Sequence, residues 1–197
     1  MLIASIIAVA LIIERFITLR ENKIIPDGLL EKAVSAYREQ GITAELVAGL
    51  ARNSPLGQVL AAGLRNHNSS RYVMKDAVEE AGRGVTHELE RYLTTLGTIA
   101  SISPLMGLFG TVVGMIEIFG SQGPTGASPT QLAHGISVAL YNTGFGLVIA
   151  IPAMIFFRHF RGKVESFVFE MEQQSSKLVD VVHGERLDYG GPQARQG

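Results

Sequence analysis

Two long runs without a charged side chain constrain this chain more than any other feature. No Asp, Glu, Lys or Arg occurs from Gly97 to Ile116, or from Gly135 to Phe157. A helix of about 20 apolar residues crosses the ~30 Å hydrocarbon core of a bilayer, so each run is long enough to span a membrane. The sequence therefore predicts an all-α, polytopic membrane protein, and the 47% content of hydrophobic residues fits that class.

A third apolar run covers residues 1–13 and ends abruptly at Glu14-Arg15. As a helix it measures only ~20 Å, which is less than the thickness of the hydrocarbon core. A signal peptide is the alternative, because residues 8–10 resemble a cleavage site. However, no positive residue precedes the run, and apolar residues continue past that site. We therefore expect a first transmembrane helix that is short, tilted or incomplete at its start.

The positive residues indicate how the spans are oriented. Eleven of the 17 Lys and Arg lie between Arg15 and Arg91, six lie from Arg158 onward, and none lies in residues 121–133. Basic residues collect in cytoplasmic segments. This pattern places the N-terminus and residues 121–133 outside and the C-terminus in the cytoplasm of a multi-pass membrane protein.

Together these features divide the chain into seven parts. They are a first transmembrane helix (1–13), a cytoplasmic helical domain (14–95), a second transmembrane helix (96–120), a periplasmic loop (121–133), a third transmembrane helix (134–160), a cytoplasmic helical extension (161–183) and a disordered tail (184–197). Gly41 and Pro55 mark boundaries between the helices expected before residue 70. From Ser70, apolar residues recur at helical spacing into the second span, which predicts one helix of about 50 residues. The third span should likewise continue as a helix through Val182.

Both long spans carry stripes of small residues. These recur every three or four positions, at Ala100, Ser103, Gly107, Gly110, Thr111 and Gly114, and at Ala139, Thr143, Gly146, Ala150 and Ala153. In lipid, small residues let helix backbones approach closely. We therefore expect Gly107, Gly110, Gly114, Gly146 and Ala150 to mediate helix packing. Pro104 and Pro152 each remove a backbone hydrogen bond, so they predict helix kinks.

Thr111 and Thr143 lie at matching depths. Each is nine residues inward from an expected outer end, Gly120 or His134. That distance is ~14 Å, close to the midplane of a ~30 Å core. Two hydroxyls at one level would form a polar ring in an oligomer and line a proton pathway. Alternatively, each hydroxyl bonds only the i−4 carbonyl of its own helix.

Glu117 is the only carboxylate between the two spans' ends, about 5 Å from the outer end, so a hydrated outer pore mouth is its expected place. Catalytic motifs are missing. Gly162-Lys163 is followed by Val164 where a phosphate-binding loop needs Ser or Thr, and no zinc-protease motif is present. The chain has no cysteine, and its net charge of −1 gives no case for nucleic acid. We therefore expect no enzyme activity, catalytic residue, cofactor or metal.

The sequences of the second and third expected spans contain motifs that are specific to one protein family. Residues 103–115, SPLMGLFGTVVGM, resemble the second-span signature of the ExbB, TolQ and MotA family. The third-span signature is matched by GISVAL at 135–140, followed by Thr143, Gly146-Leu147 and AIPA at 150–153. The first segment, which ends in IIERF at residues 12–16, also looks like the ExbB pattern. Three spans are unlike the four of flagellar MotA.

The resemblance implies an ExbB-type motor subunit of the bacterial inner membrane, with a periplasmic N-terminus and a cytoplasmic C-terminus. It implies a homopentamer in the membrane lipid, whose central pore holds the single-span helices of an ExbD-like partner, and proton flow that moves a TonB-like protein to drive transport across the outer membrane. Thr111 and Thr143 match the family's pore threonines, which are expected to face the partner's membrane Asp. One departure is Val138, because many members carry Glu there.

Two other functions stay open. A TolQ-like stator for envelope maintenance would use the same physics. A passive membrane scaffold for a partner helix would need the small-residue stripes but not the threonines.

Overall fold

The computed structural model describes residues 1–120 and 129–184, and within them every regular element is a helix. In chain order the helices are α1 (Leu2–Thr18), α2 (Glu21–Ile24), α3 (Leu29–Gln40), α4 (Ala44–Asn53), α5 (Pro55–Arg65), α6 (Arg71–Glu90), α7 (Leu93–Gly120) and α8 (Pro129–Val182). Of the expected periplasmic loop, 121–133, residues 121–128 lie outside the described residues, whereas 129–133 form the start of α8. Of the expected tail, 184–197, the structure describes only Gly184.

The chain forms two compact units. The apolar unit comprises Met1–Ile17 and Arg91–Arg161, and the helical domain comprises Thr18–Glu90 and the segment from Gly162. The 54-residue α8 contributes to both, because it continues without interruption from Pro129 to Val182. The apolar run from Gly135 thus continues as helix through Val182.

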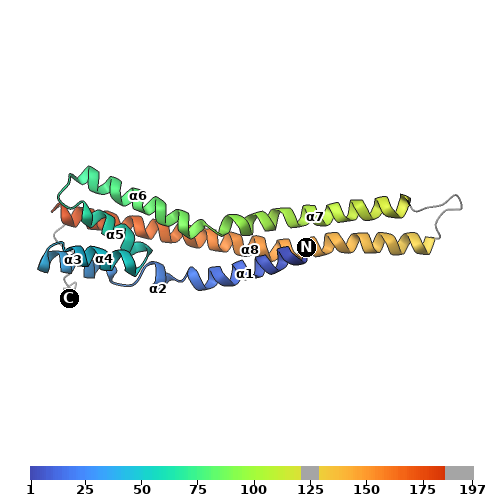
Figure 1. Ribbon diagram of the computed structural model, residues 1–197, viewed down its shortest axis with the longest axis horizontal. Coiled ribbons are helices and arrows are strands. Elements are labelled where there is room, and N and C mark those ends of the chain that lie inside the picture. Colours follow the sequence, from blue (N-terminus) through green and yellow to red (C-terminus); the bar gives the residue numbers. More distant parts are fainter. Residues whose placement is uncertain (121–128, 185–197) are drawn as a thin grey trace, which may run out of the picture. The chain divides into compact units, whose positions relative to one another are not determined.

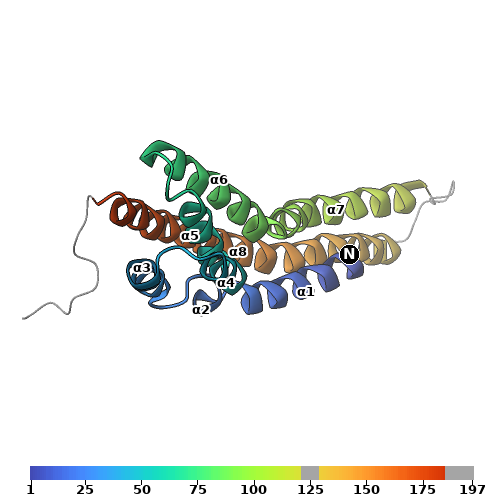
Figure 2. The same cartoon turned by 60° about the vertical axis from the view of Figure 1, so that its left-hand side comes forward.

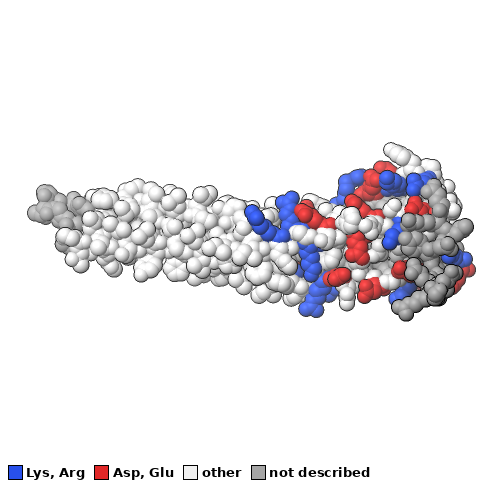
Figure 3. Space-filling view, turned by 180° about the vertical axis from the view of Figure 1, so that it is seen from behind, with Lys and Arg blue, Asp and Glu red and all other residues white. Residues whose placement is uncertain are grey.

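Within residues 1–120 and 129–184, two helices are long and apolar enough to cross a membrane, α7 and α8. The 17-residue α1 reaches that standard only together with the residues after a bend, Glu21–Glu39. On the face seen in Figure 3, a long stretch of α7 and α8 shows neither acidic nor basic side chains. Large apolar side chains are exposed on these two helices, including Leu105, Phe109, Phe145 and Val148. Such a surface is suited to lipid or to other helices, and not to water.

Within the apolar unit, α7 and α8 run antiparallel and side by side, with α1 against α8 (Figures 1 and 2). The ring of Phe16 on α1 lies edge-on to Phe156 and Phe160, with centroids 5.5 and 5.0 Å away. Aromatic rings prefer this edge-to-face geometry. The contact fixes the end of α1 beside α8.

The single helix predicted from Ser70 into the second span is wrong. α6 ends at Glu90 and α7 begins at Leu93, with a turn at Arg91 and Tyr92. At the turn, the Tyr92 ring has the guanidinium groups of Arg15 and Arg91 at 4.9 and 5.4 Å from its centroid. These cation–π contacts favour the interrupted backbone, and periodicity along one helix could not reveal them.

The helical domain is organised around α5. Its side chains Leu56, Leu60 and Leu64 are fully buried, together with Met74 of α6 and Leu178 of α8. Local signals set the helix ends. The Thr43 and Ser54 hydroxyls accept from backbone N–H groups as N-caps of α4 and α5, and Gly41, at φ 72°, ends α3 as predicted.

Candidate functional site

The α7–α8 contact depends on glycines that lie opposite backbone atoms. A Cβ at Gly107 would lie 2.8 Å from the carbonyl oxygen of Asn142, and one at Gly146 would lie 2.6 Å from that of Ser103. Both distances are too short for a side chain. These glycines therefore permit a close approach that any other residue would prevent.

Two other predicted packing residues, Gly110 and Gly114, lie along the same contact. A Cβ at Gly114 would meet the Cβ of Ala139 at 3.1 Å, and one at Gly110 would meet that of Asn142 at 3.1 Å. Ala150 is buried. Pro104 and Pro152 lie inside α7 and α8, which continue on either side of them, so a kink at each remains a prediction.

Thr111 and Thr143 are in direct contact. Their Oγ1 atoms are 2.5 Å apart, although the residues are 32 positions apart in the chain. Thr111 Oγ1 lies 3.1 Å from the Ala139 carbonyl oxygen, and Thr143 Oγ1 lies 3.3 Å from that of Gly107. Gly107 is the i−4 residue of Thr111, and Ala139 is the i−4 residue of Thr143. Each hydroxyl therefore reaches the carbonyl oxygen at the i−4 position of the other threonine, on the opposite helix.

The hydrogen bond of a threonine to the i−4 carbonyl of its own helix, the alternative drawn from the sequence, is also present for Thr111. Thr111 Oγ1 is 3.2 Å from its own i−4 carbonyl, at Gly107. Because each hydroxyl has a single proton, these contacts are alternatives that the pair shares. Two protons are distributed over two carbonyl oxygens and the bond between the hydroxyls. The site thus accepts and donates hydrogen bonds, and it holds no ionisable group.

Glu117 lies apart from the threonine pair. It is exposed on α7, three residues before the end of the helix at Gly120. Val138 of α8 is half exposed and offers no polar atom. In the described parts of the two spans, no carboxylate therefore accompanies the threonines at their level.

Two features of the apolar unit were not predicted from sequence. Arg15 is 3% exposed, donates to the Glu14 carboxylate at 2.7 Å and contacts the Tyr92 ring. The sequence feature that could have indicated this site is the pair of opposite charges directly after an apolar run. Tyr141 and Asn142 are exposed beside Thr143. Their signal was three consecutive polar side chains within a charge-free run.

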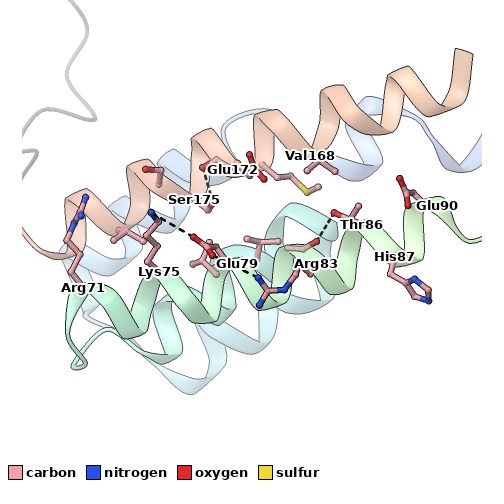
Figure 4. Close-up of a pocket in the computed structure, with 16 residues that line it drawn as sticks. Arg71, Lys75, Glu79, Arg83, Thr86, His87, Glu90, Val168, Glu172 and Ser175 are labelled. Carbon is pink, nitrogen blue, oxygen red and sulfur yellow. Dashed lines mark hydrogen bonds and ion pairs between the residues drawn. The ribbon is translucent and has the colours of Figure 1, made fainter. Parts of the chain in front are cut away.

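The helical domain has its own cavity, of about 750 Å³, between α6 and α8 (Figure 4). Apolar side chains, including Val59, Val78 and Met171, line it together with Arg71, Lys75, Arg83, Glu79, Glu90 and Glu172. Glu79 pairs with Lys75 at 3.8 Å and with Arg83 at 4.0 Å. Basic and acidic residues thus balance, and the lining indicates no preferred charge. Among the described residues, no cluster of His, Asp or Glu could hold a metal.

The architecture defines a class of protein. Two long apolar helices approach through glycines, and hydroxyls are shared between them far from any charge. These are properties of a helical membrane protein whose spans are built for close packing.

Comparison with known proteins makes the identification specific. Residues 51–173 match the MotA/TolQ/ExbB proton channel family, and the chain belongs to this family. It is 34% identical over 189 residues to the biopolymer transport protein ExbB-like 3 of Synechocystis, covering 91% of this chain and 86% of the relative. It is 34% identical over 157 residues to the biopolymer transport protein exbB1 of Vibrio cholerae, covering 77% and 69%. It is 30% identical over 173 residues to the Tol-Pal system protein TolQ of Pseudomonas aeruginosa, covering 78% and 75%. The family membership predicted from the hairpin motifs is confirmed.

Proposed function

We propose that the chain is the ExbB-type subunit of a proton-driven motor in the bacterial inner membrane. In this proposal it assembles as a homopentamer around the single-span helices of an ExbD-like partner and couples proton flow to a TonB-like protein and outer-membrane import. The observation that carries the proposal is the contact between Thr111 and Thr143 within two charge-free runs, with no ionisable group in the described spans beside it.

The chemistry of the pair explains why a partner is needed. A proton crosses a bilayer through a group that can lose and regain it near the midplane, and hydroxyls do not ionise near neutral pH. Glu117 is too near the outer end to serve the whole path. A carboxylate from a partner helix would supply the missing group, and we assign this role to the membrane Asp of an ExbD-like protein.

The hydrogen bonds of the two threonines can be exchanged for bonds to a carboxylate of a partner helix. The carbonyls of Gly107 and Ala139 also accept backbone bonds within their own helices. Either threonine can therefore turn its proton toward an ionised carboxylate without leaving a carbonyl unpaired. Once the carboxylate is protonated, the threonine oxygens can accept from it, and the attraction weakens. This cycle of charge would produce movement between the two chains.

Orientation and assembly follow from the same features. The one-sided basic residues favour a periplasmic N-terminus and a cytoplasmic C-terminus. The exposed apolar side chains of α7 and α8 leave ample surface for contacts with lipid, other copies and the partner.

A TolQ-like stator is the second candidate, since relatives of both names are similar to this chain. The two functions differ in the partner that binds. Retention of an ExbD-like and TonB-like pair would favour the first, and retention of Tol proteins the second.

Proton flux in liposomes tests the proposal. The chain alone should conduct no more than empty liposomes, and the chain with its ExbD-like partner should conduct protons. An Asp→Asn change in the partner's membrane helix should abolish that flux. Substantial flux from the chain alone, or unchanged flux with the Asn partner, would contradict the mechanism.

A further inference from the structure

Three polar residues follow one another on α8 at the level of the threonine pair. Thr143 turns toward α7, where it contacts Thr111, while Tyr141 is 68% exposed and Asn142 is also exposed. Successive residues of an α-helix lie about 100° apart, so these two side chains occupy the surface of α8 beside and behind the α7 contact.

Asn142 is placed by Gly110. A Cβ at Gly110 would lie 3.1 Å from the Asn142 Cβ and 3.3 Å from its amide nitrogen. The glycine thus leaves room for the carboxamide to lie across α7. Within residues 1–120 and 129–184, neither Asn142 nor Tyr141 makes a side-chain hydrogen bond.

Exposure of these groups to lipid alone is unfavourable. An amide or hydroxyl transferred from water into hydrocarbon without a hydrogen-bond partner costs free energy, and no water replaces the lost bonds in the bilayer core. Asn142 is eight residues inward from His134, or ~12 Å along the helix, which is too deep for it to reach the headgroups. Another chain must therefore supply its partner.

The donors define what that partner carries. The carboxamide offers two N–H donors and the phenol one O–H donor, whereas an ionised carboxylate is acceptor-only. Hydrogen bonds to an ionised group are about twice as strong as neutral ones. A second copy of this chain cannot bring a carboxylate to this depth in register, because Glu117 lies about 5 Å from the outer end.

We propose that Tyr141 and Asn142 form a docking surface for a membrane helix of another chain, and that Asn142 donates to a carboxylate on that helix. The inference rests on the proposed function for the existence of the partner helix. It goes further by placing the partner's carboxylate beside Asn142, outside the α7–α8 contact, so that the threonines are not its only ligands.

Affinity in lipid nanodiscs provides the test, with the full chain and its ExbD-like partner. Asn142→Leu should weaken binding about tenfold, the effect of losing one hydrogen bond to a charged group. Tyr141→Phe should weaken it by about threefold, as for a typical interhelical bond. Ser137→Leu is the matched control, because Ser137 is exposed on the same helix and its hydroxyl already donates to the Ala133 carbonyl at 2.9 Å. It should leave binding unchanged.

A double-mutant cycle separates a direct contact from general damage. The partner's Asp→Asn should weaken binding to the wild-type chain but have much less effect on Asn142→Leu, because both changes remove the same bond. Additive effects, or unchanged binding by Asn142→Leu, would overturn the inference.

Two further outcomes are also decisive. If Asn142→Leu dissociates the oligomer of the chain alone while Ser137→Leu does not, the carboxamide pairs between copies and the inference is wrong. If the wild-type pair binds and conducts protons but the cycle is additive, the inference fails while the proposed function stands. A wild-type chain that binds no such partner would overturn both.

Discussion

Thr111 and Thr143 connect two helices through their side chains. A threonine in an apolar helix ordinarily bonds the i−4 carbonyl of its own helix. Here the hydroxyls also reach each other and the carbonyls of the opposite helix, since glycine at position 107 brings the backbones together. The pair therefore contributes both to helix association and to the polar character of the site.

Thr111→Val and Thr143→Val test these two roles. Valine keeps the shape but removes the hydroxyl, so the oligomer should still assemble while transport driven by the proton gradient falls sharply. Each change should also destabilise the α7–α8 contact by about 0.6 kcal/mol, the average for interhelical hydrogen bonds in membranes, and by no more than about 1.7 kcal/mol. Thermal unfolding in detergent and import in cells measure the two effects.

The double variant provides the control for these substitutions. Because the hydroxyls share one bond, Thr111→Val/Thr143→Val should be less destabilising than the two single changes added together. Strict additivity would mean that the hydroxyls act separately. Full transport by both single variants would show that the threonines serve only packing.

At the level of the elements, α7 and α8 are paired through their glycines. Gly146 faces the Ser103 carbonyl oxygen, whereas Gly144, two residues earlier, has no heavy atom within 4 Å of the place where a Cβ would stand. The two positions therefore offer the same substitution on the same helix with and without a steric clash.

Gly146→Ala should destabilise the protein by about 1–3 kcal/mol, as overpacking does, and lower its unfolding midpoint in detergent. Gly144→Ala should leave the midpoint unchanged or raise it, because alanine favours the helix. Equal effects of the two substitutions would show that the close α7–α8 approach does not determine stability.

The helices also differ in what ends them. Gly41 and Ser54 act within a few residues of their own positions, through a positive φ and an N-cap hydroxyl. The end of α6 at Glu90 instead coincides with contacts of Tyr92 with Arg15, which is far away in the chain. Local chemistry thus predicts the first kind of boundary but not the second.

For the whole molecule, the one-sided distribution of basic residues makes a topological prediction. The chain has no native cysteine, so single cysteines at Gly123 and Asn66 can be labelled without background. A membrane-impermeant thiol reagent added to spheroplasts should label the first and not the second. Lysed membranes should label both, which controls for reactivity.

Labelling of both positions in intact spheroplasts would contradict the proposed orientation and the number of spans. Labelling at position 66 alone would show that the orientation is the reverse of the one proposed.

The charge-free runs were enough to predict a helical membrane protein, because placing a charge in hydrocarbon is costly and runs of spanning length without charge are therefore typical of membrane helices. The sequence also predicted that Thr111 and Thr143 lie at the same level, since rise per residue is nearly constant in a helix. The family motifs around these residues predicted a membership that the comparisons confirm.

Which atoms are in contact could be known only from the packing of the helices. Depth along a helix does not specify rotation, so the contact of Thr111 with Thr143 and the exposure of Asn142 depend on how α7 and α8 pack. The buried Arg15 and the interruption at Tyr92 likewise arise from contacts between distant segments. Helical periodicity reports one element at a time, whereas a contact between elements depends on the positions of both.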